Sequence, residues 1–185
     1  MAFHERWFQG VKQRRLAEVL LQVPDGPGAL VEVGSWEGRS TILIALAFPG
    51  EPVHVIDHWK GDLRNPKSPV AELAAQRDVF FDFAQNTKQA GVYDRLVIHR
   101  DDWRNVFATW DQPIKMIFID GEHTYREVYD NVQAALPFMV PGGVLCGDDY
   151  STTYGIEQAL RDCFGPDGVT IKSGPGRAIW SRVQA

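Results

Sequence analysis

Residues 29–40, ALVEVGSWEGRS, decide the fold of this chain. The apolar run at residues 30–33 predicts a buried strand, and residues 39–48 predict a helix. Gly34 and Gly38 lie between these elements, where they allow a turn that brings a ligand close to the backbone. The unpaired N–H groups at the start of the helix face that ligand. The stretch therefore predicts a ligand-binding loop.

The spacing of the glycines separates this loop from the common nucleotide-binding loops. A dinucleotide loop has the pattern G-x-G-x-x-G, and a phosphate loop has G-x-x-x-x-G-K-[ST]. Here the pattern is Glu32-x-Gly34-x-x-x-Gly38, and no lysine precedes Ser40. We therefore expect a ligand whose recognition needs no phosphate cradle.

Length and composition favour one globular domain that does not bind nucleic acid. With 185 residues and 44% hydrophobic residues, the chain suits a single domain over residues 1–185. We divide it into an N-terminal helix and linker (1–28), a core (29–150), and a C-terminal helix and hairpin (151–185). The net charge of −5 and the pI near 5.5 argue against a generic DNA- or RNA-binding surface.

The two cysteines and the N-terminal residues predict a soluble, cytoplasmic protein. Cys146 lies in an apolar, strand-like run, so it and Cys163 fit a reduced protein better than a disulfide scaffold. Residues 1–15 contain no apolar core of signal-peptide length, and no apolar run approaches the ~20 residues needed to cross a bilayer. We expect no membrane partner, while self-association stays open.

A helix is predicted before the first strand. Residues 5–22 carry apolar side chains at a roughly helical spacing. Lys12, Arg14 and Arg15 lie among them, and we interpret this basic cluster as a solvated face rather than a binding patch. Proline and glycine at residues 24–28 end the helix and lead to the first strand.

Strands and helices alternate after the glycine loop. Strands are predicted at 53–57, 95–99, 115–120 and 144–149, and helices at 71–90, 125–136 and 155–164. Glycine and proline at residues 141–143 predict a turn before the fifth strand. Two final strands, at 169–172 and 178–181, are joined by a turn at 174–176 and predict a hairpin. Five alternating strands and a terminal hairpin predict an α/β fold: a doubly wound, mostly parallel seven-stranded sheet with an antiparallel C-terminal hairpin.

Several of these strands end on acids. Asp57 follows the second strand, roughly 20 residues beyond the glycine loop, where an acid can accept hydrogen bonds from both ribose hydroxyls. Its alternative role is that of a turn residue. After the third strand, Asp101 or Asp102 is a candidate for adenine contact and equally for the N-cap of the following helix.

The segment at residues 58–69, HWKGDLRNPKSP, predicts a loop. Trp59 within it could flank an adenine or substrate ring, or could pack against the protein. Both interpretations stay open, as does a role for the loop as a lid.

The chain resembles a known family at three places. The stretches VEVGSWEGRST, VIDHWKGD and FIDGEHTYREVYDNVQAALPFMVPGGVLCGDDY are similar to class I S-adenosylmethionine-dependent methyltransferases. Within that class, they resemble the group that includes macrolide-sugar O-methyltransferases and cephalosporin-hydroxylase-associated methyltransferases. The resemblance covers about residues 29–150. It implies a Rossmann-like fold and methyl transfer from S-adenosylmethionine to a hydroxyl of a small molecule, such as a sugar or a secondary metabolite.

The resemblance also implies roles for individual residues. Glu32, Gly34, Ser35, Gly38 and Asp57 would hold the cofactor, with Asp102 and Trp103 beside the adenine. Asp120 and His123 are the catalytic candidates. Asp120 could take the proton from the acceptor hydroxyl as well as bind metal, and His123 ranks below it, as a general base or equally as a hydrogen-bonded residue at the start of a helix.

A magnesium site is implied at the ends of the fourth and fifth strands. Asp120, Asp148 and Asp149 would hold Mg²⁺ or a similar cation, because three converging carboxylates repel each other without one and oxygen ligands favour hard cations. The alternative is that Asp148 caps a turn and Asp149 is solvated.

Two other function classes compete with the methyltransferase. An NAD-dependent oxidoreductase shares the sheet and the ribose acid, although the glycine spacing and the terminal hairpin disfavour it. A non-catalytic cofactor-binding module would share the loop but not the metal-dependent chemistry. The sequence does not identify the acceptor or the metal.

Overall fold

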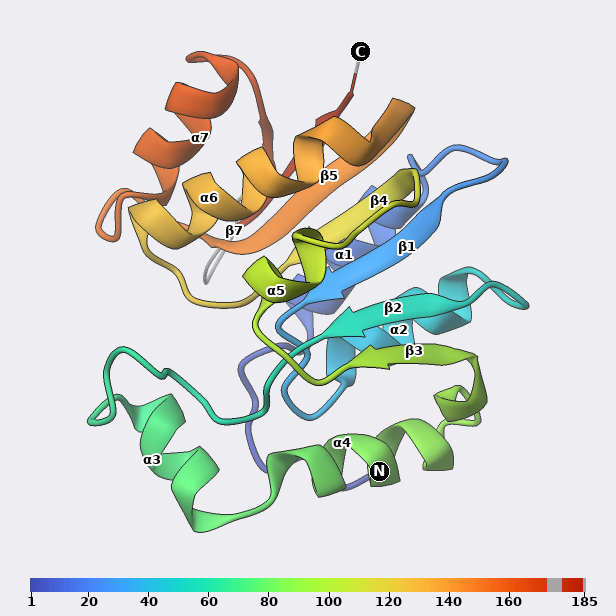
Figure 1. Cartoon of the computed structure of the whole chain (residues 1–185), viewed down its shortest axis with the longest axis vertical. Helices are drawn as coiled ribbons and strands as arrows, with labels where there is room; N and C mark the ends of the chain where they lie inside the picture. Colours follow the sequence, from blue (N-terminus) through green and yellow to red (C-terminus); the bar gives the residue numbers. More distant parts are fainter. Residues whose placement is uncertain (173–177, 185) are drawn as a thin grey trace.

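The computed structural model describes residues 1–172 and 178–184, and it contains a seven-stranded sheet (Figure 1). The strands are β1 (Ala29–Val33), β2 (Val53–Ile56), β3 (Leu96–His99), β4 (Ile114–Ile119), β5 (Met139–Tyr150), β6 (Thr170–Lys172) and β7 (Ala178–Val183). Their order is β3-β2-β1-β4-β5-β7-β6, parallel from β3 to β5, with β7 antiparallel to both β5 and β6. The predicted α/β fold and antiparallel C-terminal strands are confirmed.

Helices cover both faces of the sheet. The helices are α1 (Val11–Leu20), α2 (Arg39–Ala47), α3 (Pro69–Gln76), α4 (Val79–Gln89), α5 (Trp103–Phe107), α6 (Tyr125–Ala135) and α7 (Ile156–Phe164), with short 3₁₀ turns η1 (Tyr93–Arg95) and η2 (Leu136–Phe138). In Figure 1, α5, α6 and α7 lie in front of the sheet and α1 and α2 behind it. None of the helices within 1–172 and 178–184 is long and apolar enough to cross a bilayer.

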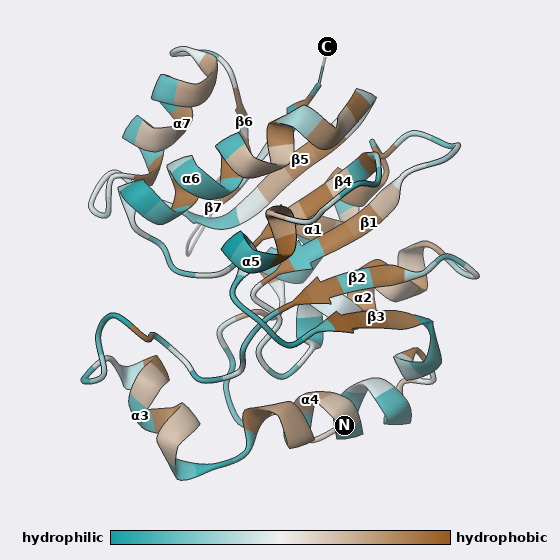
Figure 2. Ribbon diagram, in the orientation of Figure 1, coloured by the Kyte–Doolittle hydropathy of each residue, from teal (hydrophilic) through white to brown (hydrophobic). Residues whose placement is uncertain are grey.

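Alternate strand residues supply two cores, one on each face. Leu30, Met116 and Phe118 pack with buried residues of α1, α2 and α4, whereas Val31 and Ile117 pack with those of α5, α6 and α7. Successive side chains in a strand point to opposite faces, so a strand covered on both sides is mostly apolar, with a few buried polar residues such as Glu32 and Lys115. Figure 2 shows this concentration of hydrophobic residues along the strands.

The predicted helix at 71–90 is in fact two helices, α3 and α4. Arg77 is extended (φ −153°, ψ 159°), and Asp78 caps α4 by accepting the Phe81 N–H at 3.0 Å. Aspartate favours an N-cap over a helix interior because its carboxylate satisfies an otherwise unpaired N–H group. None of the residues of α3 is fully buried, so packing does not oppose the break.

Two other boundaries differ from the prediction. The helix expected at 5–22 is α1, and residues before it are irregular because side chains elsewhere hold them: Asn86 Oδ1 and the Glu37 carboxylate accept the N–H groups of Ala2 and His4. Residues 141–143, predicted as a turn, belong to the long strand β5, since Gly142 N–H and Gly143 O bond to Gln184. The turn predicted at 174–176 lies outside the described residues.

The carboxyl ends of the parallel strands meet at one edge of the sheet. The Gly34 N–H donates to Ile56 O at 2.9 Å, and the Asp120 N–H donates to Val33 O at 2.8 Å. The Asp57 N–H donates to His99 O at 3.1 Å. The segments that leave β1, β2 and β4 are thereby locked side by side, and their acids share this edge.

Candidate active site

The glycine turn after β1 is packed too tightly for any other residue. Gly34 has φ +85°, and a Cβ there would lie 2.4 Å from the carbonyl oxygen of Asp120. Gly38 has φ +83°, and a Cβ there would lie 2.9 Å from the ring of Phe83. Both glycines are therefore required by backbone conformation and by close approach.

Asp57 holds this turn in place. Its Oδ2 accepts the backbone N–H groups of Ser35 at 2.8 Å and Trp36 at 3.0 Å, and its Oδ1 accepts that of Trp59 at 2.6 Å. A carboxylate has about four acceptor positions, and these three bonds leave one of them, on Oδ1, for a ligand hydroxyl. The acid predicted to bind ribose is thus joined directly to the predicted cofactor loop.

Glu32 lies beneath the turn and is fully buried. Its Oε2 accepts hydrogen bonds from the hydroxyls of Ser35, at 2.8 Å, and Thr41. Burial raises the pKa of Glu32 to about 7, although these hydroxyls act in the opposite direction. Its Oε1 is buried without a hydrogen-bond partner, so the carboxylate has one oxygen available to a ligand.

Glu32 should make the protein less stable as the pH rises from about 4.5 to about 7. The raised pKa in the folded state means that protonation favours folding, so this stabilisation is complete below the pKa of the unfolded chain and is lost as the pH passes the folded value. At most about 3–4 kcal/mol is involved. Urea unfolding across pH 4.5–8 should show a flatter pH dependence for Glu32→Gln than for wild type. Parallel curves would contradict this role of the buried carboxyl.

Asp102 and Trp103 lie at the start of α5. Asp102 caps the helix by accepting the Arg104 N–H at 2.8 Å, so the N-cap interpretation is confirmed. The Trp103 Nε1 donates to Glu127 Oε2 at 3.3 Å, and the Arg104 guanidinium lies 4.2 Å from the Trp103 ring centroid. Asp102 and Trp103, the two residues predicted to contact adenine, are therefore held in place by Arg104 and Glu127 at the same edge of the sheet.

A hollow of about 420 Å³ lies beside Asp101, between the end of β3 and α5, and neither Asp102 nor Trp103 lines it. Its lining includes His99, Asp101, Asn105 and Trp110. The acids after β4 and β5 do not line it. Open space therefore borders the end of the site where adenine is predicted.

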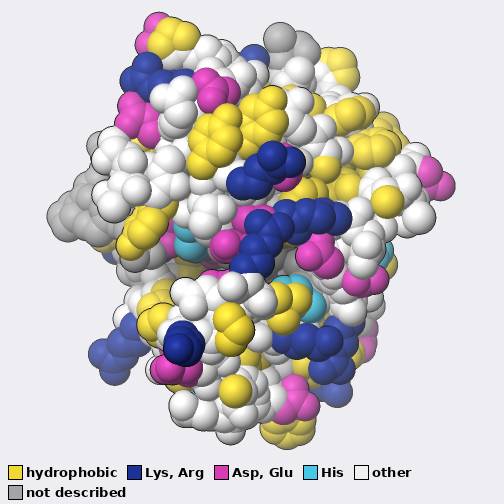
Figure 3. Space-filling model, turned by 60° about the vertical axis from the view of Figure 1, so that its left-hand side comes forward, with side chains coloured by type: hydrophobic (Ala, Val, Ile, Leu, Met, Phe, Trp, Pro, Cys, Tyr) yellow, Lys and Arg dark blue, Asp and Glu magenta, His cyan; other side chains and the backbone are white. Residues whose placement is uncertain are grey.

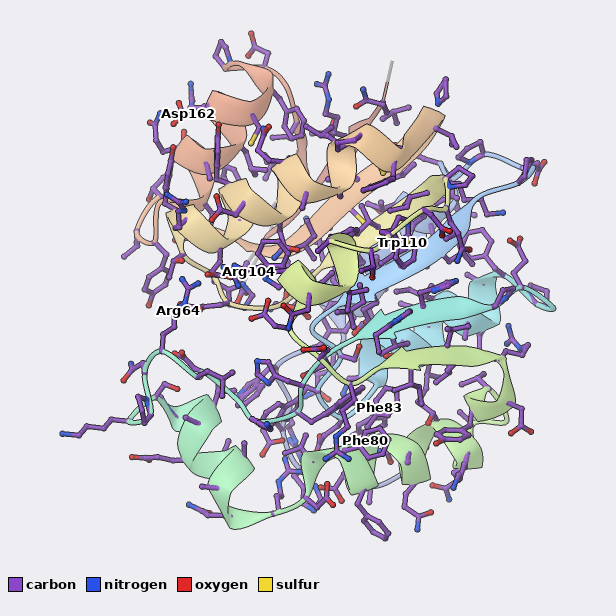
Figure 4. All side chains as sticks on the ribbon, in the orientation of Figure 1. Arg64, Phe80, Phe83, Arg104, Trp110 and Asp162 are labelled. Atoms are coloured by element: carbon purple, nitrogen blue, oxygen red, sulfur yellow. The ribbon has the colours of Figure 1, made fainter. Side chains whose placement is uncertain are left out.

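Arg64 connects the loop at 58–69 to helix α6 at this edge of the sheet. Arg64 and Arg104 both pair with Glu127, a buried residue in the first turn of α6. Figure 4 shows Arg64 reaching up from the loop toward Arg104, and Figure 3 shows basic side chains crossing the middle of this face beside acidic ones. Trp59 is only 4% exposed and packs against Phe83, so its packing interpretation holds.

The acids predicted at the ends of β4 and β5 gather with His123. His123 Nε2 lies 3.0 Å from Asp149 Oδ2 and 3.8 Å from Asp120 Oδ1. Asp149 has φ +57°, a strained conformation for a non-glycine residue that aims its carboxylate at this cluster. Burial, together with Asp148, raises the pKa of Asp120 well above its ordinary value. Burial also raises the pKa of Asp148, to about 6.

Lys12 joins this cluster, contrary to the prediction that it belongs to a solvated face. Its Nζ donates to Asp148 Oδ2 and, at 2.9 Å, to Asp149 Oδ1, and its side chain is 14% exposed. Burial lowers the pKa of Lys12, but the two carboxylates outweigh it and the net shift is upward. Arg14 is exposed as expected. The sequence contains no signal for this pairing, because 136 residues separate Lys12 from Asp148.

The three aspartates do not close around a single point. Among residues 1–172 and 178–184, one group of three His, Cys, Asp or Glu side chains brings its ligand atoms within 4.8 Å of one another, and it is His4, Glu37 and Asp82. Arg77 already pairs with Glu37 and Asp82, so that group belongs to an ion-pair network. The carboxylates of Asp120, Asp148 and Asp149 are spread wider.

The strand order, the glycine turn after β1 and the acid after β2 define the class I S-adenosylmethionine-dependent methyltransferases. The chain belongs to the methyltransferase-domain family, whose model matches residues 31–150. The match to this family favours the methyltransferase over both competing interpretations, the oxidoreductase and the non-catalytic module.

Solved structures of methyltransferases share the fold at low sequence identity. The O-methyltransferase NovP superposes with a TM-score of 0.69 at 20% identity, over 94% of this chain and 81% of NovP. The O-methyltransferase TomG from Streptomyces achromogenes, in complex with S-adenosylmethionine, has a TM-score of 0.66 at 18% identity, over 97% and 82%. An O-methyltransferase from Bacillus cereus, in complex with S-adenosylhomocysteine, has a TM-score of 0.67 at 18% identity, over 97% and 84%.

Proposed function

We propose that this methyltransferase transfers the methyl group of S-adenosylmethionine to a hydroxyl of a small molecule, a sugar or another secondary metabolite. The observation that carries this proposal is the position of His123 and Asp120 directly beside the glycine turn, where the backbone of Asp120 contacts Gly34. A proton acceptor is needed there, because a hydroxyl is a poor nucleophile until its proton leaves. O-methyltransferases among the similar structures support the same choice, CalS11 being a TDP-rhamnose 3′-O-methyltransferase.

The cofactor would lie along the edge of the sheet from Glu32 to Trp103. Gly34, Ser35 and Gly38 would pass beneath its methionine part, and the Glu32 oxygen that lacks a partner would face a donor there. Asp57 would accept a ribose hydroxyl with the one acceptor position that remains on Oδ1. Asp102 and Trp103, at the start of α5, would contact the adenine.

The reaction is an in-line displacement in which the bond from the methyl carbon to sulfur breaks as the bond to the acceptor oxygen forms. The products are the methylated acceptor, S-adenosylhomocysteine and a proton. His123 can take the proton on Nδ1 while Nε2 donates to Asp149 Oδ2, because a hydrogen bond from Nε2–H fixes the tautomer in which Nδ1 is unprotonated. Asp120, whose raised pKa brings it nearer neutrality, is the second candidate for the proton.

The predicted magnesium site fits the chemistry of its donors but not their arrangement. Three carboxylates, one with a buried oxygen that lacks a partner, suit a hard cation. However, their oxygens are not within reach of one ion, and Lys12 already bonds two of them. The transfer described above therefore uses no metal, only His123 and Asp120.

We keep the cytoplasm as the predicted compartment, because Cys146 and Cys163 are both free. The partner is a small-molecule acceptor. We predict that the protein binds neither nucleic acid nor a membrane. The prediction leaves open whether it forms homo-oligomers.

Calorimetry with S-adenosylhomocysteine and with NAD tests the cofactor, and a panel of acceptors tests the hydroxyl chemistry. We expect binding of S-adenosylhomocysteine without response to NAD. With nucleotide-activated sugars and phenols as acceptors, release of S-adenosylhomocysteine should reveal turnover. Tight NAD binding without binding of S-adenosylhomocysteine would overturn the proposal.

His123→Gln should lower turnover about 10²-fold while leaving affinity for S-adenosylhomocysteine unchanged, because only proton transfer is lost. The matched control is His58→Gln, in the loop at 58–69, where the ring accepts a backbone N–H at 3.0 Å. Equal turnover in both variants would remove His123 from the mechanism and leave Asp120 as the proton acceptor.

A further inference from the structure

A lysine ammonium lies where the family resemblance expects a metal. Lys12 Nζ bonds one oxygen of Asp148 and one of Asp149. The second oxygen of Asp149 faces His123 at 3.0 Å. Asp149 therefore bridges an ammonium on one side and the predicted proton acceptor on the other.

Helix α1 keeps Lys12 in this position. Leu16 and Val19 are completely buried in the core behind the sheet, and Phe8 packs edge-on against Phe118 with ring centroids 5.7 Å apart. Ahead of the helix, Glu37 accepts the His4 N–H at 3.1 Å. Removing Lys12 from the carboxylates by moving the helix would expose this apolar surface, at a cost of about 25 cal/mol per Å². The ammonium is a fixed part of the cluster rather than the end of a free tail.

Lys12 occupies one oxygen of each acid, so a divalent ion at Asp148 and Asp149 would have only Asp148 Oδ1 and the Asp149 Oδ2 that faces His123, both next to the ammonium. Two cations at hydrogen-bond distance from the same carboxylates repel each other strongly in a buried site. Asp148 is 2% exposed and Asp149 is 6% exposed, so water screens this repulsion poorly. Binding of Lys12 and binding of a metal at these acids are thus mutually exclusive.

We propose that Lys12 is a positioning residue that takes the place of the divalent cation, neutralising Asp148 and holding Asp149 toward His123. The protein then needs no metal for this cluster to keep its shape. This proposal rests on the proposed function in one respect, the role of His123 as the proton acceptor.

Binding of Mn²⁺ to the full chain, measured from the loss of the free-ion electron paramagnetic resonance signal, tests the proposal. Wild type and Asp148→Asn should bind Mn²⁺ equally weakly, because Lys12 excludes the ion from these acids. Lys12→Met removes the charge and keeps most of the stem. It should bind Mn²⁺ at least about tenfold more tightly than Lys12→Met combined with Asp148→Asn, because the vacated carboxylates then need another cation. Arg14→Met, an exposed residue of the same helix, should behave as wild type.

Thermal unfolding gives a readout that is independent of the ion signal. Lys12→Met should melt several degrees below wild type, since it leaves buried carboxylates without their partner, and Mn²⁺ should restore part of the loss. Tighter Mn²⁺ binding by wild type than by Asp148→Asn would overturn the proposal, and that comparison holds even when Lys12→Met does not fold. An unchanged melting temperature in Lys12→Met with no gain in Mn²⁺ affinity would also overturn it. Failure to bind S-adenosylhomocysteine would count against the proposed function and not against Lys12.

Discussion

Gly34→Ala is expected to abolish measurable binding of S-adenosylhomocysteine and to lower the free energy of unfolding by about 2–4 kcal/mol. The added Cβ would lie 2.4 Å from the carbonyl oxygen and 2.6 Å from the carbonyl carbon of Asp120. Both are backbone atoms at the end of a buried strand, so they cannot rotate away. The turn must move instead, and with it the Ser35 N–H that Asp57 holds.

Gly50→Ala is the matched control for Gly34→Ala. Gly50 has φ +88°, nearly the same backbone conformation, but a Cβ there would meet nothing within 4 Å. It should therefore show the conformational cost alone, about 1 kcal/mol, with normal cofactor affinity. Urea unfolding and calorimetry separate the two effects. If Gly34→Ala and Gly50→Ala have the same free energy of unfolding and the same affinity for S-adenosylhomocysteine, the close contact between the turn and Asp120 is not needed for cofactor binding.

Asp57→Asn should weaken binding of S-adenosylhomocysteine about 10³-fold. The carboxylate accepts three backbone N–H groups, from Ser35, Trp36 and Trp59. An asparagine has one oxygen acceptor, and its amide N–H₂ would face N–H groups on the other side. The cofactor turn would then lose its anchor, together with the predicted acceptor of the ribose hydroxyls.

The control for Asp57→Asn is Asp78→Asn, which removes the same charge. Asp78 caps α4 with a single bond to the Phe81 N–H, and asparagine is an equally good N-cap. Its cofactor affinity should match that of wild type in calorimetry. An Asp57→Asn protein that binds S-adenosylhomocysteine within about threefold of Asp78→Asn would show that the loop needs no carboxylate beneath it.

Much of the site follows from local sequence and the rules of parallel sheets. Gly34 and Asp57 were predicted as one site because strands that alternate with helices run parallel, and the segments after them meet at one edge. The same reasoning brings Asp120 and Asp149 to that edge. The break in the helix at 71–90 could have been found as well, because Asp78 is a residue type that favours N-caps.

Other parts had no local signal. Arg64 joins the loop to Glu127, and Lys12 joins α1 to Asp148, across long stretches of chain. In the sequence, Lys12 lies in a basic cluster that is typical of a solvated surface.

The sequence by itself determined the order of the strands, the glycine turn and the acids that follow the strands, because each depends on residue type and short spacing. Its resemblance to a known family indicated the methyltransferase class. Only the tertiary structure decided what neutralises those acids. The packing of Leu16 and Val19 sets the rotation of α1, and that rotation directs Lys12 into the acidic cluster while Arg14 stays exposed. A charged side chain four carbons long can reach solvent or a buried partner equally well, so its partner is chosen by the helix that carries it.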